Sequence, residues 1–296
     1  MQAIHESNLS SDCSVNEEEH SLFQHYIEEI SGITIPPEKA YLFETRLTKL
    51  MLDYGTESFC EFYQYIKNHP SKSLQQKIID SITTNETLWF RDVLPWTVLE
   101  QIYLPRYIHD LRSGAKTRIR IWSAASSTGQ EIYSIVMCIQ KYLVDHRITD
   151  IQLSHFEFLA TDISNRVLEI AKEGRYDQIS MSRGLPEEYK SQFFTEQNNS
   201  WEIDPSIKKA VRFRQSNLIH DFQAFGSFDV IFCRYVLIYF NDQIKRELMM
   251  KFIRSLKVEG IFFTGSYTLY NMMCDYLTAK HYQNLTYYIK EGEQRE

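Results

Sequence analysis

Small residues and a glycine follow an apolar run near the middle of the chain, where main-chain atoms could approach a ligand. The run RIRIWSAAS covers residues 118–126, and the sequence continues through Gly129 into the helix-like stretch QEIYSIVMCIQKYLVDH. Glycine is scarce in this chain, with 10 in 296 residues against a usual share of about 7%, so its placement is informative. The pattern predicts a strand, a tight turn and a helix whose N-terminus can receive a ligand. An ordinary turn between a strand and a helix would have the same composition.

An acidic residue stands at the end of the next apolar run, FEFLATDI (156–163). A carboxylate at the place of Asp162 commonly accepts hydrogen bonds from the two ribose hydroxyls of a nucleoside. Asp162 and Ser164 also form a good helix cap, and the two roles are compatible. The preceding turn lacks the GxGxxG motif that binds a pyrophosphate, so NAD and FAD fit poorly. A cofactor without phosphates, such as S-adenosylmethionine, fits better.

The elements that must position these residues alternate between strands and helices after about residue 118. This alternation is typical of βαβ units around a parallel sheet. The expected strands are 118–126, 156–163, 211–218, 228–233 and 260–268. Two of the helices between them have Ser164 and Asn241 as expected N-caps. In such sheets ligands bind beyond the carboxyl ends of the strands, so residues just after each run are candidates for the site.

The first part of the chain has a different pattern. Residues 1–20 are polar and acidic, so we expect a mobile tail that leads into a helix near Ser21. Over 21–82 the apolar residues recur at helical spacing, and breaks at 32–37, 53–58 and 68–73 separate short helices. We therefore expect an N-terminal helical domain over 21–82, an interdomain linker and first helix over 83–117, and an α/β domain over 118–296. Residues 175–210 fit neither pattern and are expected to form an insertion.

Composition restricts the class of protein further. With 43% hydrophobic and 24% charged residues, the chain is expected to be a soluble globular protein with a sizeable core. A net charge of −7 argues against broad nucleic-acid binding. The five cysteines are far apart without a CxxC pair, so we expect buried free thiols and no metal site. No signal peptide and no apolar run of roughly 18 residues is present, which predicts a cytoplasmic protein without membrane insertion.

Five motifs occur together along the chain. They are TTNETLWFRD (83–92), WSAASSTGQEIYSI (122–135), LATDIS (159–164), SNL (216–218) and CRYVLIYF (233–240). Their order and spacing resemble those of the CheR-type chemotaxis receptor methyltransferases, over nearly the whole chain. The resemblance implies an α/β, Rossmann-like, S-adenosylmethionine-dependent methyltransferase domain with a small inserted β subdomain at about 175–210, preceded by an all-α domain.

The resemblance also implies an activity. Members of this family transfer the methyl group of S-adenosylmethionine to glutamate side chains of chemoreceptors, which yields methyl esters and S-adenosylhomocysteine in chemotaxis adaptation. The implied partner is the cytoplasmic signalling domain of a chemoreceptor, and we expect a monomer. Two alternatives stay open: a degenerate member that binds cofactor or a signalling partner without turnover, and a methyltransferase with another acceptor.

Individual residues take implied roles from the same motifs. The residues expected around the methionine end of the cofactor are Asn85, Thr87, Arg91, Glu131, Arg234 and Tyr235. Arg91 would face the cofactor carboxylate, Asp162 would hold the ribose, and Asn217 and Leu218 would meet the adenine. On propensity alone, the motif at 83–92 could equally be a capped helix start with Arg91 and Asp92 on a solvated face.

Catalysis of this kind needs little acid–base machinery. A glutamate carboxylate with a pKa of about 4.3 is ionised at neutral pH and can attack the methyl group directly. Arg91 and Tyr239 are the expected catalytic residues, with the Tyr239 hydroxyl bonded to the acceptor carboxylate or the reacting centre, although a tyrosine in this aromatic stretch would also suit packing. Arg46 and Lys49 lie a turn apart and are expected to bind the receptor, although ordinary solvated charges show the same spacing.

The sequence departs from the resembled family at four places. Tyr235 stands where most members have Asn, Ser126 replaces a usual Cys, Ile132 replaces a common Pro, and the element at 260–268 loses its His-Ser-Glu end. We expect the Tyr235 ring to enter the apolar core and leave only its main chain to the cofactor; in the alternative, the ring crowds the pocket. Tethering to a receptor C-terminal peptide is not expected, because FFTEQNNSWEI (193–203) has no glycine.

Overall fold

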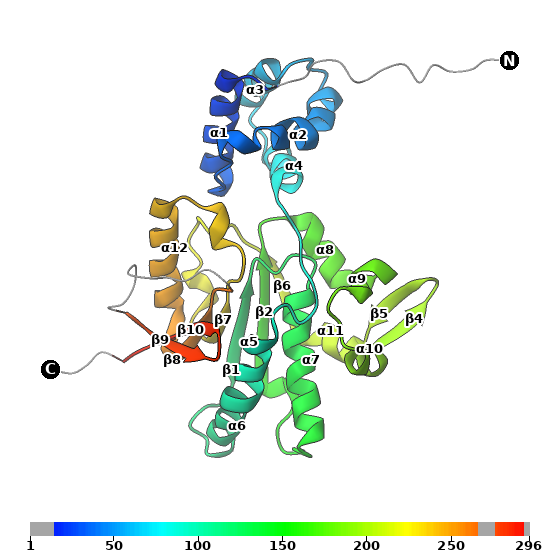
Figure 1. Ribbon diagram of the computed structural model, residues 1–296, viewed down its shortest axis with the longest axis vertical. Helices are drawn as coiled ribbons and strands as arrows, with labels where there is room; N and C mark the ends of the chain where they lie inside the picture. The colour runs from blue at the N-terminus through cyan, green and yellow to red at the C-terminus, as the bar shows by residue number, and fades with distance from the viewer. Residues whose placement is uncertain (1–14, 266–275, 293–296) are drawn as a thin grey trace. The chain divides into compact units, whose positions relative to one another are not determined.

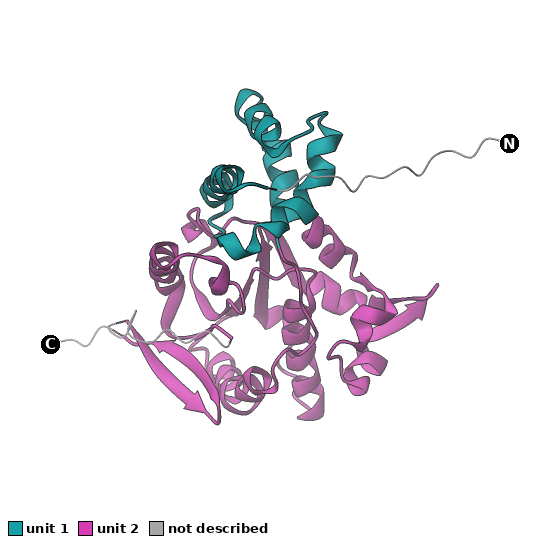
Figure 2. Cartoon of the chain, turned by 45° about the horizontal axis from the view of Figure 1, so that its top comes forward, with its two compact units in different colours: residues 1–83 teal, residues 84–296 magenta. Residues whose placement is uncertain are grey.

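The chain divides after Thr83 into two compact units, which Figure 2 shows in separate colours. The computed structural model describes residues 15–265 and 276–292. The first unit is all-helical and the second is an α/β unit, so the expected fold class is confirmed (Figure 1). Of residues 83–117, expected as an interdomain linker and first helix, all but Thr83 belong to the second unit. Within the described ranges, no helix combines the length and apolar character that crossing a bilayer requires.

Four α-helices form the described part of the first unit. They are α1 (Glu17–Ser31), α2 (Tyr41–Asp53), α3 (Phe59–Asn68) and α4 (Lys72–Ile82). Their core is aromatic, because the ring of Phe23 contacts those of Phe43, Phe59 and Phe62, and all four residues are fully buried. Aromatic rings of this size supply much of the apolar area that stabilises a small helical unit. The predicted break at 32–37 falls between α1 and α2, and those at 53–58 and 68–73 fall at the next two connections, where they overlap the helix ends by one or two residues.

Helix α1 begins earlier than the expected start near Ser21. The Asn16 side chain accepts the main-chain N–H of Glu19 at 2.9 Å, and the Glu19 carboxylate accepts the Asn16 N–H at 3.2 Å. This reciprocal capping box satisfies two main-chain donors at the helix start. The acidic residues that suggested a tail therefore belong to the first turn, where negative charge interacts favourably with the helix dipole.

A seven-stranded mixed sheet forms the centre of the second unit, in the order β6-β2-β1-β7-β8-β10-β9. The first five strands in this order are parallel, whereas β10 is antiparallel to both neighbours. The strands are β1 (Ile119–Ala124), β2 (Phe156–Asp162), β6 (Val211–Gln215), β7 (Phe228–Phe232), β8 (Leu256–Phe263), β9 (Leu277–Tyr282) and β10 (Leu285–Lys290). The β9–β10 hairpin was not predicted, because its tight turn contains no glycine and Gln283 itself adopts a positive φ of 52°.

Two predicted strands differ from the observed ones. The run expected over 211–218 ends at Gln215, where the N–H of Ser216 donates to the Asp162 carbonyl and the chain turns. The run expected over 260–268 begins at Leu256 and ends at Phe263. Its last residues, 266–268, lie outside the described residues.

Helices cover both faces of the large sheet. They are α5 (Val93–Val98), α6 (Leu104–Arg112), α7 (Gln130–Asp145), α8 (Asn165–Glu173) and α12 (Asp242–Ser255). Side chains alternate along β1, so that Ile121 joins an apolar cluster with α5, α6 and α7, while Trp122 joins a second cluster with α12. The predicted N-caps Ser164 and Asn241 are confirmed, since each accepts a main-chain N–H of its helix. Burial on both faces fixes the strand register, and with it the positions of the strand ends.

The insertion expected at 175–210 contains a separate antiparallel sheet of order β3-β5-β4. Its elements are β3 (Arg175–Tyr176), α9 (Gln178–Ser182), α10 (Glu187–Phe193), β4 (Phe194–Gln197), β5 (Ser200–Ile203) and α11 (Pro205–Ala210). Phe194 and Tyr176 both make edge-on contacts with the buried Trp89 ring. The small sheet therefore packs against the segment that precedes α5.

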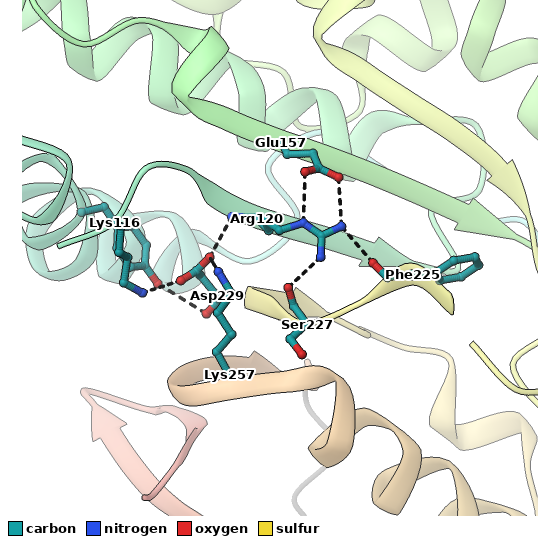
Figure 3. Close-up of polar contacts among 8 residues, drawn as sticks. Lys116, Arg120, Glu157, Phe225, Ser227, Asp229 and Lys257 are labelled. Atoms are coloured by element: carbon teal, nitrogen blue, oxygen red, sulfur yellow. Dashed lines mark hydrogen bonds and ion pairs between the residues drawn. The ribbon is translucent and has the colours of Figure 1, made fainter. Parts of the chain in front are cut away.

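A buried carboxylate joins the amino ends of three strands of the large sheet (Figure 3). Asp229 on β7 has a side chain 1% exposed and accepts the ammonium groups of Lys116 and of Lys257, the latter at 2.7 Å. It also accepts the main-chain N–H of Arg120 at 2.8 Å. Burial opposes ionisation of Asp229, but the Arg120 amide and the two lysines outweigh it and lower the pKa of the carboxyl. Beside it, Arg120 pairs through two N–H groups with Glu157.

The cysteines in the described ranges are free thiols, as expected, but they are not uniformly buried. Cys138 and Cys233 are fully buried, and burial raises the pKa of both thiols. Cys60 is exposed on α3, whereas its neighbours Phe59 and Phe62 on the same helix are buried. Cys13 and Cys274 lie outside the described residues.

Candidate functional site

Strained main chain gathers at the carboxyl ends of β1 and β7 and in the segment before α5. Five of the ten positive-φ residues other than glycine that the structure describes lie there: Phe90, Asp92, Ala125, Ser127 and Tyr235. Such conformations are uncommon for residues with side chains and concentrate at functional sites. This end of the sheet is also where open α/β sheets bind ligands.

The turn between β1 and α7 is held by Asp162 at the end of β2. One carboxylate oxygen of Asp162 accepts the Ser127 N–H at 2.8 Å, and the other accepts the Ser164 N–H at 2.9 Å. Gly129 has a φ of 95°, and a Cβ there would lie 3.0 Å from the Ala171 Cβ. Glycine is therefore required by the close approach of α7 to α8 as well as by the turn. Asp162 therefore stabilises the turn between β1 and α7 and also places a carboxylate beside it.

A buried arginine follows β7. The Arg234 side chain is 1% exposed and bonds Glu131 at 3.0 Å and Asp92 at 2.6 Å, and it also donates to the Arg91 carbonyl. Glu131, at the start of α7, accepts the Ser123 hydroxyl at 2.8 Å. These contacts join β1, α7, β7 and the segment before α5. Arg234 therefore links these segments through buried charged contacts, and the two carboxylates offset the cost of burying its charge.

Tyr235 does not enter the apolar core, so that expectation is wrong. Its ring lies 3.4 Å from the guanidinium carbon of Arg91, and its hydroxyl donates to Asp92 at 2.6 Å. The reason is its main chain, which has a φ of 59° and directs the side chain toward the segment before α5. Burial and the bond to Asp92 raise the pKa of the Tyr235 phenol, which thus stays a proton donor at neutral pH. A solvated helix face for Arg91 and Asp92 is likewise excluded.

The segment that contains Asn85 and Thr87 is tied to the same turn. The Ser127 hydroxyl donates to the Asn85 carbonyl at 2.8 Å, and both Asn85 and Thr87 are half-buried. Trp89 anchors the segment to the insertion, since its N–H donates to the Arg183 carbonyl at 3.0 Å and its indole N–H to the Ser180 carbonyl at 3.1 Å. The structure thus brings the motif at 83–92 to the carboxyl ends of the strands.

The residues expected near the adenine follow β6. The Asn217 side-chain oxygen accepts the Ile219 N–H at 3.2 Å in a tight turn. Leu218 is 6% exposed and packs in the apolar cluster that contains Trp122 and Phe222. Its side chain is therefore part of the core as well as of the expected site.

Tyr239 ends a short 3₁₀ turn (Leu237–Tyr239) after β7 and is half-buried. Within residues 15–265 and 276–292, its hydroxyl has no hydrogen-bond partner. Phe240, which follows, is buried in the apolar cluster under α12. A half-buried phenol of this kind can donate a hydrogen bond to a ligand.

Arg46 and Lys49 lie on α2 in the first unit. Arg46 donates a hydrogen bond at 2.5 Å to the carbonyl of Ile82, the last residue of α4. A cation at this end of a helix pairs with a terminal carbonyl and interacts favourably with the helix dipole. Lys49 is exposed. The contact of Arg46 gives it a structural task that the sequence did not suggest.

Asp92 is the main residue of the site that sequence reasoning missed. It accepts hydrogen bonds from both Arg234 and Tyr235 although its side chain is 43% exposed. The signal was its place directly after Arg91 in the motif at 83–92, but an Arg-Asp pair is also common on solvated helices. Its φ of 58° could not be derived from residue type.

The donors and acceptors at this end of the sheet fit S-adenosylmethionine. Arg91 makes no ion pair within the described ranges, so its planar guanidinium can receive a carboxylate. The Asp162 carboxylate suits ribose hydroxyls, which would share it with the two main-chain amides. Ser126 Oγ and Arg234 Nε are buried without a partner within those ranges, which is expected of a site that a polar ligand completes.

Comparisons with known proteins agree with this geometry. The all-alpha domain of CheR methyltransferases matches residues 18–83, and the SAM binding domain of CheR methyltransferases matches residues 85–278. The chain is 37% identical over 262 residues to the chemotaxis protein methyltransferase Cher2 of Pseudomonas putida, which covers 88% of this chain and 92% of the relative. It is 39% identical over 264 residues to chemotaxis protein methyltransferase 1 of Pseudomonas aeruginosa, with the same shares of 88% and 92%. The chain therefore belongs to the CheR methyltransferase family and carries that family's domain for binding S-adenosylmethionine.

Proposed function

We propose that this protein transfers the methyl group of S-adenosylmethionine to glutamate side chains in the cytoplasmic signalling domain of a chemoreceptor. The observation that supports this most is the placement of Asp162, Arg234 and Arg91 around the carboxyl ends of β1, β2 and β7, in a chain of the CheR family. The chemotaxis methyltransferase relatives support the same acceptor class. Such an acceptor places the protein in the cytoplasm, and we propose that it acts as a monomer.

We propose that different residues of the site bind the ribose, the adenine and the methionyl group of the cofactor. Asp162 would bind the ribose hydroxyls, and the turn at Asn217 and Leu218 would contact the adenine. Toward the methionyl end, Arg91 would pair with the carboxylate while Asn85 and Thr87 line the pocket. Glu131 and Arg234 are bonded to each other, so we propose that they shape the pocket wall rather than change charge during the reaction.

The chemistry requires alignment more than proton transfer. When bound, the cofactor supplies an electrophilic sulfonium methyl group. An ionised glutamate oxygen would form the new bond to that carbon as the bond from carbon to sulfur breaks, and the electron pair of the broken bond would stay on sulfur. No proton moves, so no general base is needed, and correct orientation is worth at most roughly 7–11 kcal/mol of the barrier. The Tyr239 hydroxyl would orient the attacking carboxylate by donating a hydrogen bond to it.

Receptor binding through the first unit is a further part of the proposal. Lys49 is exposed on α2, whereas Arg46 is engaged with the end of α4, so Lys49 is the better test of a charge contact with an acidic receptor helix. Lys49→Glu should raise KM for the receptor a few-fold and leave KM for S-adenosylmethionine unchanged. Lys67→Glu, at an exposed position of α3, is the matched control and should change neither. Equal KM values for both variants and the native protein would remove Lys49 from the receptor contact.

The activity is tested by transfer of a labelled methyl group to purified receptor signalling domains, followed by mild base. We expect label on the receptor that is released as methanol, because carboxyl methyl esters are base-labile and N-methyl groups are not. A receptor fragment with its acceptor glutamates replaced by alanine should take up no label. Base-stable label would indicate another acceptor chemistry, and cofactor binding without any transfer would indicate a member that has lost turnover.

A further inference from the structure

The Tyr235 side chain makes contacts that neither turn geometry nor core packing requires. Its ring faces the Arg91 guanidinium at 3.4 Å, and its hydroxyl donates to Asp92 at 2.6 Å. Gly265 adjoins the ring, and a Cβ at Gly265 would lie 3.1 Å from the ring atom Cε2. A side chain at position 265 would therefore press against the Tyr235 ring, whereas glycine leaves the ring its space.

The main chain of Tyr235 makes this choice of residue unusual. Its φ of 59° lies in the left-handed region, where Asn is favoured and a tyrosine is uncommon. A bulky aromatic residue in this conformation needs contacts that hold it, and those contacts run to Arg91 and Asp92.

The two arginines at this site differ in what binds their charge. Arg234 is bonded to Glu131, Asp92 and the Arg91 carbonyl. Arg91 has no hydrogen bond from its guanidinium and no ion pair within the parts of the chain that are described; it has only the face of the Tyr235 ring. A guanidinium that contacts a ring through its face keeps its N–H groups, which lie in its plane, for a planar anion. Carboxylates are the anions that match this fork with two parallel bonds.

We infer that Tyr235 is a positioning residue that fixes Arg91 as a receptor for a carboxylate. The ring holds the guanidinium in one orientation, and the hydroxyl ties the ring through Asp92 to the buried Arg234. This inference rests on the proposed function. The carboxylate has two sources there, the methionyl group of the cofactor and the glutamate of the acceptor, and the experiment separates them.

The first arm measures binding of S-adenosylhomocysteine and of 5′-methylthioadenosine, which lacks the amino-acid part, by isothermal titration calorimetry. For a cofactor carboxylate, Tyr235→Leu should weaken S-adenosylhomocysteine binding about tenfold, the scale of a partly desolvated cation–π contact, and leave methylthioadenosine unchanged. Tyr235→Phe keeps the ring and should lose less than about threefold. Trp201→Leu removes a comparable contact with Lys190 (4.0 Å) in the inserted sheet, and should change neither ligand.

The second arm measures the KM for the receptor. If the carboxylate belongs to the acceptor, Tyr235→Leu should raise this KM about tenfold and leave S-adenosylhomocysteine binding unchanged. Should Tyr235→Leu fail to fold, Tyr235→Asn removes the ring with a residue that suits the left-handed main chain, and the same results are expected of it.

A double-mutant cycle shows whether Tyr235 acts through Arg91. In an Arg91→Ala background, Tyr235→Leu should have no further effect on the affected constant, because the group it positions is gone. Additive losses, equal losses for both ligands, or unchanged constants in both arms would overturn the inference. If the native protein binds no S-adenosylhomocysteine at all, the proposed function fails, and this inference falls with it.

Discussion

The two ends of the large sheet use the same kinds of charged residue to different effect. At the amino end, Asp229 is 1% exposed, and its oxygens are taken by Lys116, Lys257 and the Arg120 amide. At the carboxyl end, Arg234 is equally buried and bonded to two carboxylates, yet Arg91 beside it has none within the described ranges. The amino end is closed, because its own residues satisfy one another, whereas the carboxyl end is open, because it keeps a guanidinium without a carboxylate partner within the described ranges, as expected of a ligand-binding site. Unpaired polar groups thus distinguish a binding site from a structural anchor more clearly than charge does.

The largest effect, on the free energy of unfolding, is expected from removing the buried Asp229 carboxylate at the amino end of the sheet. Asp229→Ala leaves two lysines and a buried amide without their acceptor, so we expect a loss of about 3 kcal/mol in the free energy of unfolding. Urea unfolding measures it, and the affinity of the folded variant for S-adenosylhomocysteine should be unchanged. Asp150→Ala breaks the exposed pair with Arg112 and serves as the control, with almost no change in Tm. A strong loss of ligand affinity in Asp229→Ala would contradict the separation of the two ends.

The next effect concerns the open end. Asp162→Ala should weaken S-adenosylhomocysteine binding by about 1.5–3 kcal/mol, the scale of hydrogen bonds to a charged group. Some stability should be lost too, because Asp162 also accepts the amides of Ser127 and Ser164. Ser164→Ala removes only the cap of α8 and should lower Tm without changing affinity. If both variants lose stability and neither loses affinity for S-adenosylhomocysteine, the role of Asp162 is only to stabilise the turn between β1 and α7.

A smaller effect is expected for the acceptor side of the site. Tyr239→Phe removes one hydroxyl and should lower kcat about tenfold, or about 1.4 kcal/mol, if that hydroxyl orients the attacking carboxylate. Stability and cofactor affinity should stay the same, because the hydroxyl has no partner within the described residues. Steady-state kinetics with receptor fragments measure the change. An unaltered kcat would assign Tyr239 to packing.

The smallest effect is a pH dependence of the free energy of unfolding that arises from Asp229. The pKa of Asp229 is lowered in the folded protein, so its contribution to stability is present above the unfolded-state value of about 3.9 and is lost as the pH falls through the folded-state value. The free energy of unfolding of the native protein should therefore fall more steeply with acid than that of Asp229→Asn. Urea titrations at several pH values compare the two. Parallel curves would show that the ionised form of Asp229 is not favoured by folding.

The sequence predicted what depends on periodicity and motif order. Helix α4, strand β1 and the N-caps Ser164 and Asn241 follow from apolar spacing and capping chemistry, and the motif at 83–92 indicated the site. The direction of the Tyr235 ring could not be predicted, because it depends on a left-handed main chain that residue type does not favour. The bond of Arg46 to the end of α4 depends on how two helices pack, and the β9–β10 turn lacks the usual glycine. Local rules give the elements, while side-chain partners at the site depend on tertiary packing.

Hydrogen–deuterium exchange with and without S-adenosylhomocysteine tests the contrast between the two ends most directly. We predict slower exchange on ligand binding in the segments at 85–92, 123–129 and 162–165, which surround the carboxyl ends of β1 and β2. Exchange at 116–120 and 228–230, around Asp229, should stay the same. Unchanged exchange at the carboxyl ends, or slowing confined to the residues around Asp229, would contradict the assignment of the open end as the cofactor site.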